Sequence, residues 1–424
     1  MNEEDVRLTR AWVLHPDIKS ESIRKDPVPA LQEAVALAAA LPGLVVAGAD
    51  IVRLPKAHPG RLFGKGKVVE LKTRLQGEDI DLVLIDGAVT PVQQRNLEED
   101  WGVKLLDRTG LILEIFADRA RTREGVLQVE LAALSYQRTR LVRAWTHLER
   151  QRGGLGFVGG PGETQIESDR RAIDDAINRI RRQLSKVVKT RELHRSARAK
   201  VPYPVVALVG YTNAGKSTLF NSVTGAEVLV KDMLFATLDP TMRSVELPSG
   251  REVILSDTVG FISELPTQLV AAFRATLEEV LGADLILHVR DISHPETETQ
   301  ARDVKAILTT LGVPDDAKLI EVWNKIDNLD NETRDAVTTQ ADRSDDIIAI
   351  SAVTGAGVDD LLMSVSKHLE ETKSTRKLKL SFSEGRKRAW LFEQGVIETE
   401  DLAENGYAFT VQWTARQEKQ FRNL

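Results

Sequence analysis

The stretch "GYTNAGKSTLF", Gly210–Phe220, decides the fold of this chain. It contains the complete pattern GxxxxGK[ST] between an apolar run, "VVALVG", and a stretch with helical spacing. In that setting the glycines let backbone N–H groups converge on a phosphate, and the positive end of the helix dipole adds to the attraction. The sequence therefore predicts a nucleotide-binding α/β domain in which Lys216 spans the β- and γ-phosphates and the Ser217 hydroxyl binds Mg²⁺.

Two further motifs complete the predicted phosphate and metal site. "DTVG" at Asp257–Gly260 follows the apolar run "EVILS", so Asp257 can hold Mg²⁺ through water and the Gly260 N–H can contact the γ-phosphate. "FATLDPT" lies between the loop and "DTVG", where the segment that responds to the γ-phosphate is expected. Its two threonines, Thr237 and Thr241, are both candidate metal ligands, and the residues alone leave the choice open. Lys216 and Gly260 are the predicted catalytic residues.

The base is predicted from "NKID", Asn324–Asp327, after the strand-like run "LIEVW". The Asp327 carboxylate can accept from guanine N1–H and the 2-amino group, whereas adenine offers neither donor and would leave the carboxylate unpaired. In "SAVTGAG", Ser351–Gly357, the Ala352 N–H is predicted to meet guanine O6, while Asn324 and Lys325 hold the loops and flank the base.

The predicted nucleotide-binding residues are Gly210, Tyr211, Thr212, Asn213, Ala214, Gly215, Lys216, Ser217, Thr218, Phe235, Ala236, Thr237, Leu238, Asp239, Asp257, Thr258, Val259, Gly260, Asn324, Lys325, Ile326, Asp327, Ser351, Ala352 and Val353.

Four parts are predicted along the chain. Residues 1–118 alternate short apolar runs with helical periods, which is typical of βαβ units and a parallel sheet. Residues 119–200 contain two amphipathic stretches around "GGLGFVGGPG", Gly153–Gly162, which predicts a helical hairpin with a glycine-rich tip. A G domain, 201–372, begins at "VPYPVV", and 373–424 form a small α/β domain. The fold class is therefore α/β, with a doubly wound, mostly parallel P-loop domain.

Composition restricts the partners. The 424 residues include no cysteine, which excludes disulfides and thiolate metal sites and fits a reducing cytoplasm. The net charge is -6, yet residues 119–200 carry 19 Lys+Arg against 9 Asp+Glu. Such a basic segment favours a polyanionic partner such as nucleic acid, the alternative being ordinary solvated helices. The longest apolar segment, residues 34–49, is interrupted by Pro42 and is too short for a span, so no stable membrane insertion is expected.

The motif set resembles a known family. "GYTNAGKS", "FATLDPT", "DTVGF", "NKID" and "SA" resemble the Obg–HflX branch of the translation-factor GTPases, in which the threonine matching Thr237 is the Mg²⁺ ligand. The upstream segments that look like HflX are "QQRNLEE" (93–99), "DRTGLILEIFADRARTREG" (107–125), "LQVELA" (127–132) and "GGPGETQIESDRR" (159–171).

The resemblance implies a GTP-hydrolysing switch that binds the large ribosomal subunit and its rRNA. It further implies that the protein splits or rescues stalled or idle ribosomes in a stress response, with the hairpin tip directed at the peptidyl-transferase centre. The expected ligands are GTP or GDP with Mg²⁺, and the chain is expected to be a monomer in the cytoplasm.

Two positions leave alternatives open. Phe261 follows "DTVG" where Ras-like GTPases have a water-orienting glutamine, so either hydrolysis is slow or a docked partner supplies the positioning. Asn213 resembles the asparagine that coordinates K⁺ in potassium-stimulated GTPases, and plain hydrogen bonding within the loop is the alternative. Two rival functions are a nucleotide-controlled RNA-remodelling factor acting on free RNA and a regulator of a membrane or protein partner.

Overall fold

The computed structural model describes residues 8–20, 26–151, 161–198, 203–225, 235, 241–263, 279–314, 316–370, 374–403, 406–413 and 415–422. The chain divides into two compact units, Met1–Glu246 with Glu252–Leu361, and Leu247–Arg251 with Leu362–Leu424. The finer division into four parts stays a prediction. None of the helices in the described ranges is long and apolar enough to cross a membrane.

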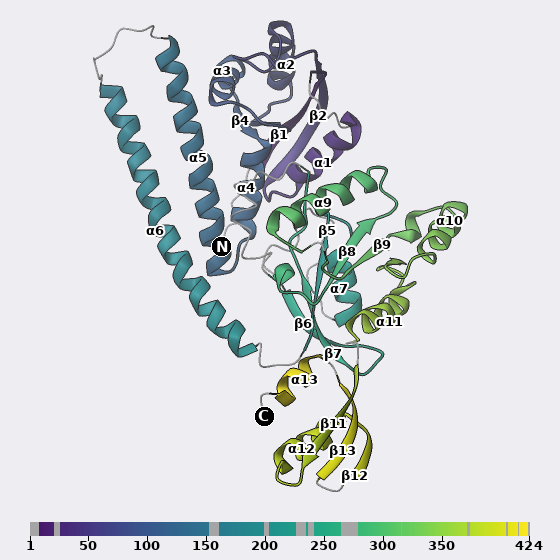
Figure 1. The fold of residues 1–424 in the computed structure, drawn as a ribbon. Coiled ribbons are helices and arrows are strands. Elements are labelled where there is room, and N and C mark those ends of the chain that lie inside the picture. Colours follow the sequence, from purple (N-terminus) through teal and green to yellow (C-terminus); the bar gives the residue numbers. More distant parts are fainter. Residues whose placement is uncertain are drawn as a thin grey trace, which may run out of the picture. The chain divides into compact units, whose positions relative to one another are not determined.

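The first part of the larger unit is a parallel four-stranded sheet with the order β2-β1-β3-β4 (Figure 1). Successive residues of β1 point to opposite faces, so Ala11 and Val13 belong to one hydrophobic cluster with α1 and α4, whereas Trp12 and Leu14 belong to another with α2 and α3. Helices therefore cover both faces, as the alternating pattern predicted. The elements are β1 (Thr9–Ile18), α1 (Pro27–Ala39), β2 (Leu44–Leu54), α2 (Lys65–Gly77), β3 (Leu82–Ile85), α3 (Pro91–Trp101), β4 (Lys104–Asp107) and α4 (Arg108–Arg119).

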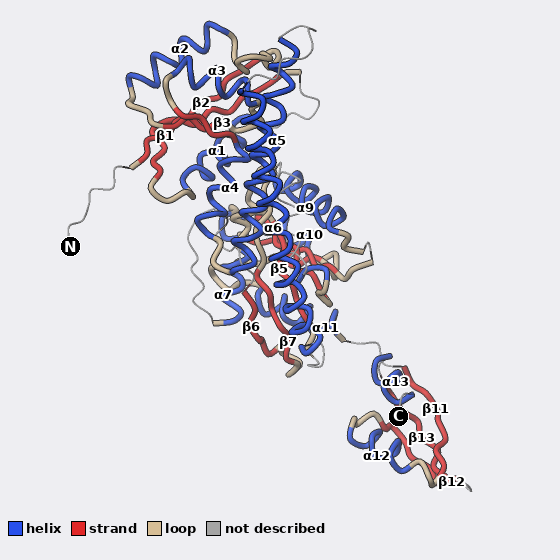
Figure 2. Tube along the Cα trace, turned by 90° about the vertical axis from the view of Figure 1, so that its left-hand side faces the viewer, coloured by secondary structure: helices blue, strands red, loops and turns tan. Residues whose placement is uncertain are grey.

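The predicted helical hairpin is formed by α5 (Arg123–Gln151) and α6 (Pro161–Arg198), which lie side by side in both views (Figures 1 and 2). An ion pair joins Arg138 of α5 to Asp174 of α6 at 2.7 Å, and Ile177 and Ile180 are buried, as the apolar stripe of α6 predicted. The predicted glycine-rich tip lies largely outside the described residues.

A second sheet in the same unit has the order β10-β9-β8-β5-β7-β6, and within it only β6 runs antiparallel to its neighbour. The carboxyl ends of β5, β7 and β9 meet at one edge, which is where ligands bind in such sheets. The motifs that follow these three strands are therefore brought together. The elements are β5 (Val205–Gly210), α7 (Lys216–Thr224), β6 (Thr241–Glu246), β7 (Glu252–Asp257), β8 (Leu285–Asp291), α9 (Thr297–Leu311), β9 (Leu319–Asn324), η1 (Ile326–Asn328), α10 (Asn331–Ala341), β10 (Ile347–Ala349) and α11 (Val358–Leu369).

The smaller unit contains an antiparallel sheet with the order β11-β13-β12. The hairpin predicted from "AENGYAFTVQW" is present, with Ala403 of β12 opposite Gly406 of β13. Phe409, Val411 and Trp413 form its core together with the helices. The elements are β11 (Ser374–Ser381), α12 (Gly385–Glu393), β12 (Ile397–Ala403), β13 (Gly406–Trp413) and α13 (Ala415–Arg422).

One hydrophobic cluster joins the two sheets of the larger unit. It contains Leu37 of α1 and Phe116 of α4 together with Val209 of β5 and Ile286 of β8. The nucleotide-binding sheet therefore shares a continuous apolar core with helices that precede it in the chain, so the two cannot move apart without exposing apolar surface.

We predict that Gly48→Ala destabilises the larger unit by about 1–3 kcal/mol, the usual cost of overpacking. The register of β1 and β2 shifts at Trp12, which then lies opposite Gly48, and a Cβ atom there would lie 2.4 Å from the buried Trp12 ring. Urea unfolding measures the change. Gly77→Ala at the end of α2 is the matched control, because its Cβ would meet nothing within 4 Å. Equal effects of the two substitutions would contradict the prediction.

Candidate nucleotide-binding site

The predicted phosphate-binding loop joins β5 to α7, and its two glycines have positive φ angles of 153° at Gly210 and 93° at Gly215. A Cβ atom on Gly210 would lie 2.1 Å from the carbonyl oxygen of Val289. A Cβ atom on Gly215 would lie 2.1 Å from Asn324 Nδ2. Only glycine fits at these positions, so the backbone N–H groups of the loop are accessible to a phosphate.

Lys216, the first residue of α7, is buried and bonded to the loop. Its Nζ donates to the carbonyl oxygens of Gly210 (3.1 Å) and Tyr211 (2.8 Å). Burial lowers the pKa of Lys216 to about 8, and the charge of Asp257 acts in the opposite direction. A Cβ atom on Gly260 would lie 3.0 Å from Lys216 Nζ. The two predicted catalytic residues therefore lie next to each other.

Ser217 and Asp257 provide adjacent oxygen atoms that fit a divalent metal. Ser217 Oγ donates to Asp257 Oδ2 at 2.7 Å, and Asp257 is fully buried at the end of β7. Hydroxyl and carboxylate oxygens are the hard donors that Mg²⁺ prefers. Thr258 Oγ1 donates to the Leu208 carbonyl oxygen at 2.6 Å, which fixes the "DTVG" segment against β5.

The segment predicted to supply the other metal ligand is described only at its ends. Thr237, with its neighbours Ala236, Leu238 and Asp239, lies outside the described residues. Phe235 is described and its side chain is buried. Thr241, the alternative ligand, is the first residue of β6 and lies opposite Asp257 in the sheet.

Asn324 connects the phosphate-binding loop to the loop predicted to hold the base. The buried side chain donates from Nδ2 to the Ala214 carbonyl oxygen at 2.8 Å. Its Oδ1 accepts from the Ala352 N–H at 2.9 Å. The Ala352 N–H is therefore engaged by Asn324 here, and its predicted contact with guanine O6 stays a proposal.

The other residues of the two base loops surround this contact. Lys325 has a positive φ of 68°, and its Nζ forms an ion pair with Asp291 at 2.8 Å. Asp327 is exposed, in η1, and Val353 is 76% exposed. Both side chains are accessible to a base bound between the loops. Five other predicted residues are buried, namely Thr212, Ala214, Val259, Ile326 and Ser351, whereas Asn213 is exposed and Thr218 is half-buried.

Phe261 faces the core, away from this site. The side chain is 1% exposed and belongs to the cluster that contains Val209. Its backbone pairs with the phosphate-binding loop, because its N–H donates to the Gly210 carbonyl oxygen at 3.1 Å and its carbonyl accepts from the Thr212 N–H at 2.6 Å. The phenyl ring therefore anchors the "DTVGF" segment and cannot orient a water molecule.

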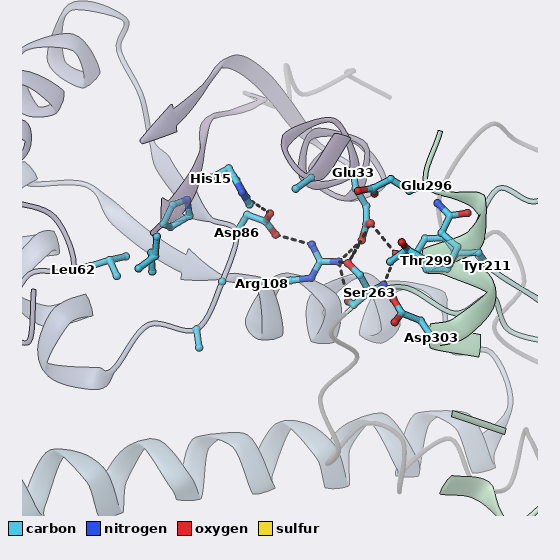
Figure 3. Close-up of a pocket in the computed structure, with 16 residues that line it drawn as sticks. His15, Glu33, Leu62, Asp86, Arg108, Tyr211, Ser263, Glu296, Thr299 and Asp303 are labelled. Carbon is cyan, nitrogen blue, oxygen red and sulfur yellow. Dashed lines mark hydrogen bonds and ion pairs between the residues drawn. The ribbon is translucent and has the colours of Figure 1, made fainter. Parts of the chain in front are cut away.

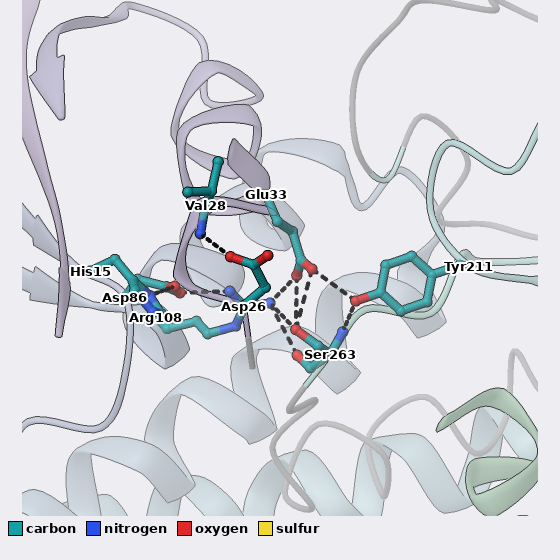
Figure 4. A network of polar contacts seen from close by, with 8 residues as sticks. All are labelled: His15, Asp26, Val28, Glu33, Asp86, Arg108, Tyr211 and Ser263. Carbon is teal, nitrogen blue, oxygen red and sulfur yellow. Dashed lines mark hydrogen bonds and ion pairs between the residues drawn. The ribbon is translucent and has the colours of Figure 1, made fainter. Parts of the chain in front are cut away.

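Sequence reasoning missed a polar network that connects the first sheet to this site (Figure 4). Arg108 Nη2, at the start of α4, donates to Glu33 of α1 and to the carbonyl and Oγ of Ser263, both at 3.0 Å. Tyr211 OH donates to Glu33 Oε2 at 2.8 Å and accepts from the Ser263 N–H. Burial would lower the pKa of Arg108, but the charges of Glu33 and Asp86 raise it well above its usual value.

A cavity of about 290 Å³ borders the network (Figure 3). Asp86 accepts from Arg108 Nη1 at 2.6 Å and is 2.7 Å from His15 Nδ1. The acidic residues that line the cavity are Glu33, Asp86, Glu296 and Asp303. The sequence contained one signal of this network: Glu33 is the only charged residue between Pro27 and Ala49.

Comparisons with known proteins cover this site and the rest of the chain. Family models match in order: GTP-binding GTPase N-terminal at residues 29–117, GTP-binding GTPase Middle Region at 119–198, 50S ribosome-binding GTPase at 205–325 and HflX C-terminal domain at 336–423. A crystal structure of an SsGBP and GDP complex is 25% identical, covering 85% of this chain and 98% of that chain, with a TM-score of 0.49.

Two bacterial relatives are aligned over most of the chain. GTPase HflX of Magnetococcus marinus is 52% identical over 363 residues, which are 85% of this chain and 82% of that protein. GTPase HflX of Escherichia coli is 45% identical over 350 residues, which are 82% of this chain and 81% of that protein. With this level of identity over both chains, and with family models that match most of residues 29–423, the chain belongs to the HflX family of GTPases.

Proposed function

We propose that this GTPase is a switch that binds the large ribosomal subunit and its rRNA, and that it separates stalled or idle ribosomes into subunits. The observation that carries the proposal is a nucleotide site in the same unit as a long, basic helical hairpin. The matching model of a 50S ribosome-binding GTPase and the HflX relatives support it.

The hairpin is long and carries positive charge, and both properties support the proposed contact with rRNA. α5 contains 29 residues and α6 contains 38, so at 1.5 Å per residue they are about 43 and 57 Å long. Exposed arginines lie along α6 and can contact rRNA phosphates. They are Arg170, Arg171, Arg179, Arg181 and Arg182. We propose that the tip is directed at the peptidyl-transferase centre.

The residues of the site have separate roles in the proposed mechanism. The loop N–H groups and Lys216 bind the phosphates, and Gly260 contacts the γ-phosphate through its N–H. Ser217 and Thr237 would hold Mg²⁺, with Asp257 behind them; the ion would neutralise charge on the phosphates. Asn324 joins the phosphate loop to the base loop, so the base and the phosphates are held in one geometry. K⁺ bound through Asn213 stays an open alternative to plain loop contacts.

Co-sedimentation with purified large subunits tests the proposal in three states: without nucleotide, with GDP and with a non-hydrolysable GTP analogue. Pelleting should be strongest with the analogue. Equal, weak pelleting in all three states would contradict the proposal and favour a factor that acts on free RNA.

Neutralising the exposed arginines Arg170, Arg171, Arg181 and Arg182 with glutamine should weaken binding to the large subunit. It should also reduce the salt dependence of binding, by roughly 0.9 in the logarithmic slope for each phosphate that is no longer neutralised. The matched control neutralises the exposed pair Arg376 and Lys377 in β11. An unchanged slope in the α6 variant would show that the hairpin charge does not contact rRNA.

Asp327→Asn should change base specificity. The amide keeps one acceptor, its carbonyl oxygen, for the base N1–H, but it places a donor opposite the 2-amino group of guanine, where it suits the 2-oxo group of xanthine. The loss of the negative charge and of the hydrogen bond from the 2-amino group predicts roughly a 100-fold decrease in GTP affinity, with a gain for XTP. Fluorescent-nucleotide binding measures both. The control is Asp330→Asn, whose side chain caps α10 through the Thr333 N–H at 2.9 Å. Parallel changes for both nucleotides would contradict the assignment of Asp327.

Ser217→Ala should make nucleotide binding insensitive to Mg²⁺, because it removes one of the two adjacent metal-binding oxygens. In the unaltered protein, chelation of Mg²⁺ with EDTA should weaken GTP binding by roughly tenfold, equivalent to about 1.4 kcal/mol. Ser217→Ala should show the weakened value with and without EDTA. Thr224→Ala, at the other end of α7, is the control and should respond to EDTA like the unaltered protein.

A further inference from the structure

We propose that α4 positions both segments that flank the nucleotide site, with Arg108 and Arg119 at its two ends as positioning residues for GTP hydrolysis. This inference rests on the proposed nucleotide site, but it does not depend on the ribosome.

The C-terminal end of α4 holds the residue that begins "FATLD". Arg119 Nη1 donates to the Phe235 carbonyl oxygen at 2.8 Å, and Nη2 donates to the Ala40 carbonyl oxygen at 2.9 Å. The Phe235 ring is 2% exposed and meets Phe116 edge-on, with the ring centroids 4.6 Å apart. Backbone and ring of Phe235 are therefore both fixed by α4, two residues before the proposed metal ligand Thr237.

The N-terminal end of α4 holds the residue that follows "DTVGFI". Arg108 donates to both the carbonyl and the hydroxyl of Ser263, three residues after Gly260. Its guanidinium is 7% exposed and is balanced by Glu33 and Asp86. A buried charge held in this way has little freedom to move, because a displacement from its two carboxylates would leave it desolvated without compensation.

The two contacts act on groups that must be placed together. Hydrolysis needs the metal ligand and the γ-phosphate-sensing N–H in position at the same time. α4 has 12 residues and is about 18 Å long, so a single rigid helix contacts both segments. Since Phe261 cannot orient water, placement of these backbone segments has a larger share in catalysis than it has where a glutamine is present.

α4 is also fixed to the hairpin, through its N-cap. Asp107 accepts from the Gly110 N–H (2.8 Å), from Tyr136 OH (2.6 Å) and from Arg140 Nη1 (3.0 Å). Tyr136 and Arg140 belong to α5, so a displacement of α4 is transmitted to the hairpin. The helix that contacts the nucleotide segments therefore also determines the position of α5.

The first test is steady-state GTP hydrolysis by Arg119→Ala without ribosomes. We expect kcat to fall roughly tenfold, equivalent to about 1.4 kcal/mol of transition-state stabilisation. Affinity for the non-hydrolysable GTP analogue should fall relative to GDP affinity, because GDP lacks the γ-phosphate to which both segments are proposed to respond. Arg119→Lys, which retains one donor, should recover part of kcat. Glu114→Ala, an exposed position on the same helix, is the matched control.

A purely structural role of Arg119 would give a different result. In that case Arg119→Ala would lower the thermal stability and reduce the affinity for both nucleotides by the same factor, and kcat would be unchanged. This outcome would overturn the proposal. Ser263→Ala tests the other end without leaving a buried charge unpaired, and it should lower kcat in the same direction. If Asp327→Asn failed to change base specificity, the proposed nucleotide site would be contradicted. That result is distinguishable from a failure of the proposal about α4.

The second test measures the hairpin. Because the chain has no cysteine, Ala172→Cys in α6 and Glu332→Cys in α10 can carry a fluorophore pair without background labelling. Transfer efficiency should differ between GDP and the GTP analogue, and Tyr136→Phe, which removes the bond to Asp107, should reduce this difference. An identical difference with and without Tyr136→Phe would contradict the transmission through α4.

Discussion

The buried guanidinium of Arg108 is the interaction on which the arrangement of the larger unit depends. Desolvating a charge costs several kcal/mol, and only close, well-oriented partners offset that cost. Glu33, Asp86 and Ser263 supply them, and they come from α1, the end of β3 and the segment after "DTVGFI". Three parts of the chain that are distant in sequence must therefore meet at the Arg108 guanidinium. The network of charged groups has one low-energy geometry.

The shared hydrophobic cluster and the Arg108 network have different consequences. The apolar cluster that includes residues of α4 and β5 holds the first sheet to the G domain, but apolar contacts are non-directional and tolerate small sliding movements. The bonds from Arg108 to Ser263 and from Tyr211 to Glu33 are directional, so they fix the register of that contact. Because Tyr211 belongs to the phosphate-binding loop, these bonds also fix the position of that loop relative to α1.

The fold class followed from the sequence, and so did the proximity of the predicted motifs, because their determinants are local; the roles of the site residues stay predictions. Gly210, Lys216 and Asp257 stand at fixed spacings after apolar runs, and parallel strands place the ends of such runs at one edge. The alternating pattern of residues 1–118 predicted the first sheet for the same reason. The sequence predicted that Asn324 holds the loops, but its partners, Ala214 and Ala352, could not be derived, since they depend on how the strand ends meet in space.

The role of α4 could not be predicted because no local pattern encodes it. Arg108 and Ser263 are 155 positions apart, and Arg119 and Phe235 are 116 apart. Each is an ordinary residue in its own segment, and only the folded chain brings them together. The contacts of α4 matter for hydrolysis because of Phe261. Its ring is buried in the core, so the residue after "DTVG" offers no side chain that could orient water. Within the protein itself, the proposed control of hydrolysis then acts through the backbone of the flanking segments, and α4 contacts these segments at Phe235 and Ser263 from outside the G domain.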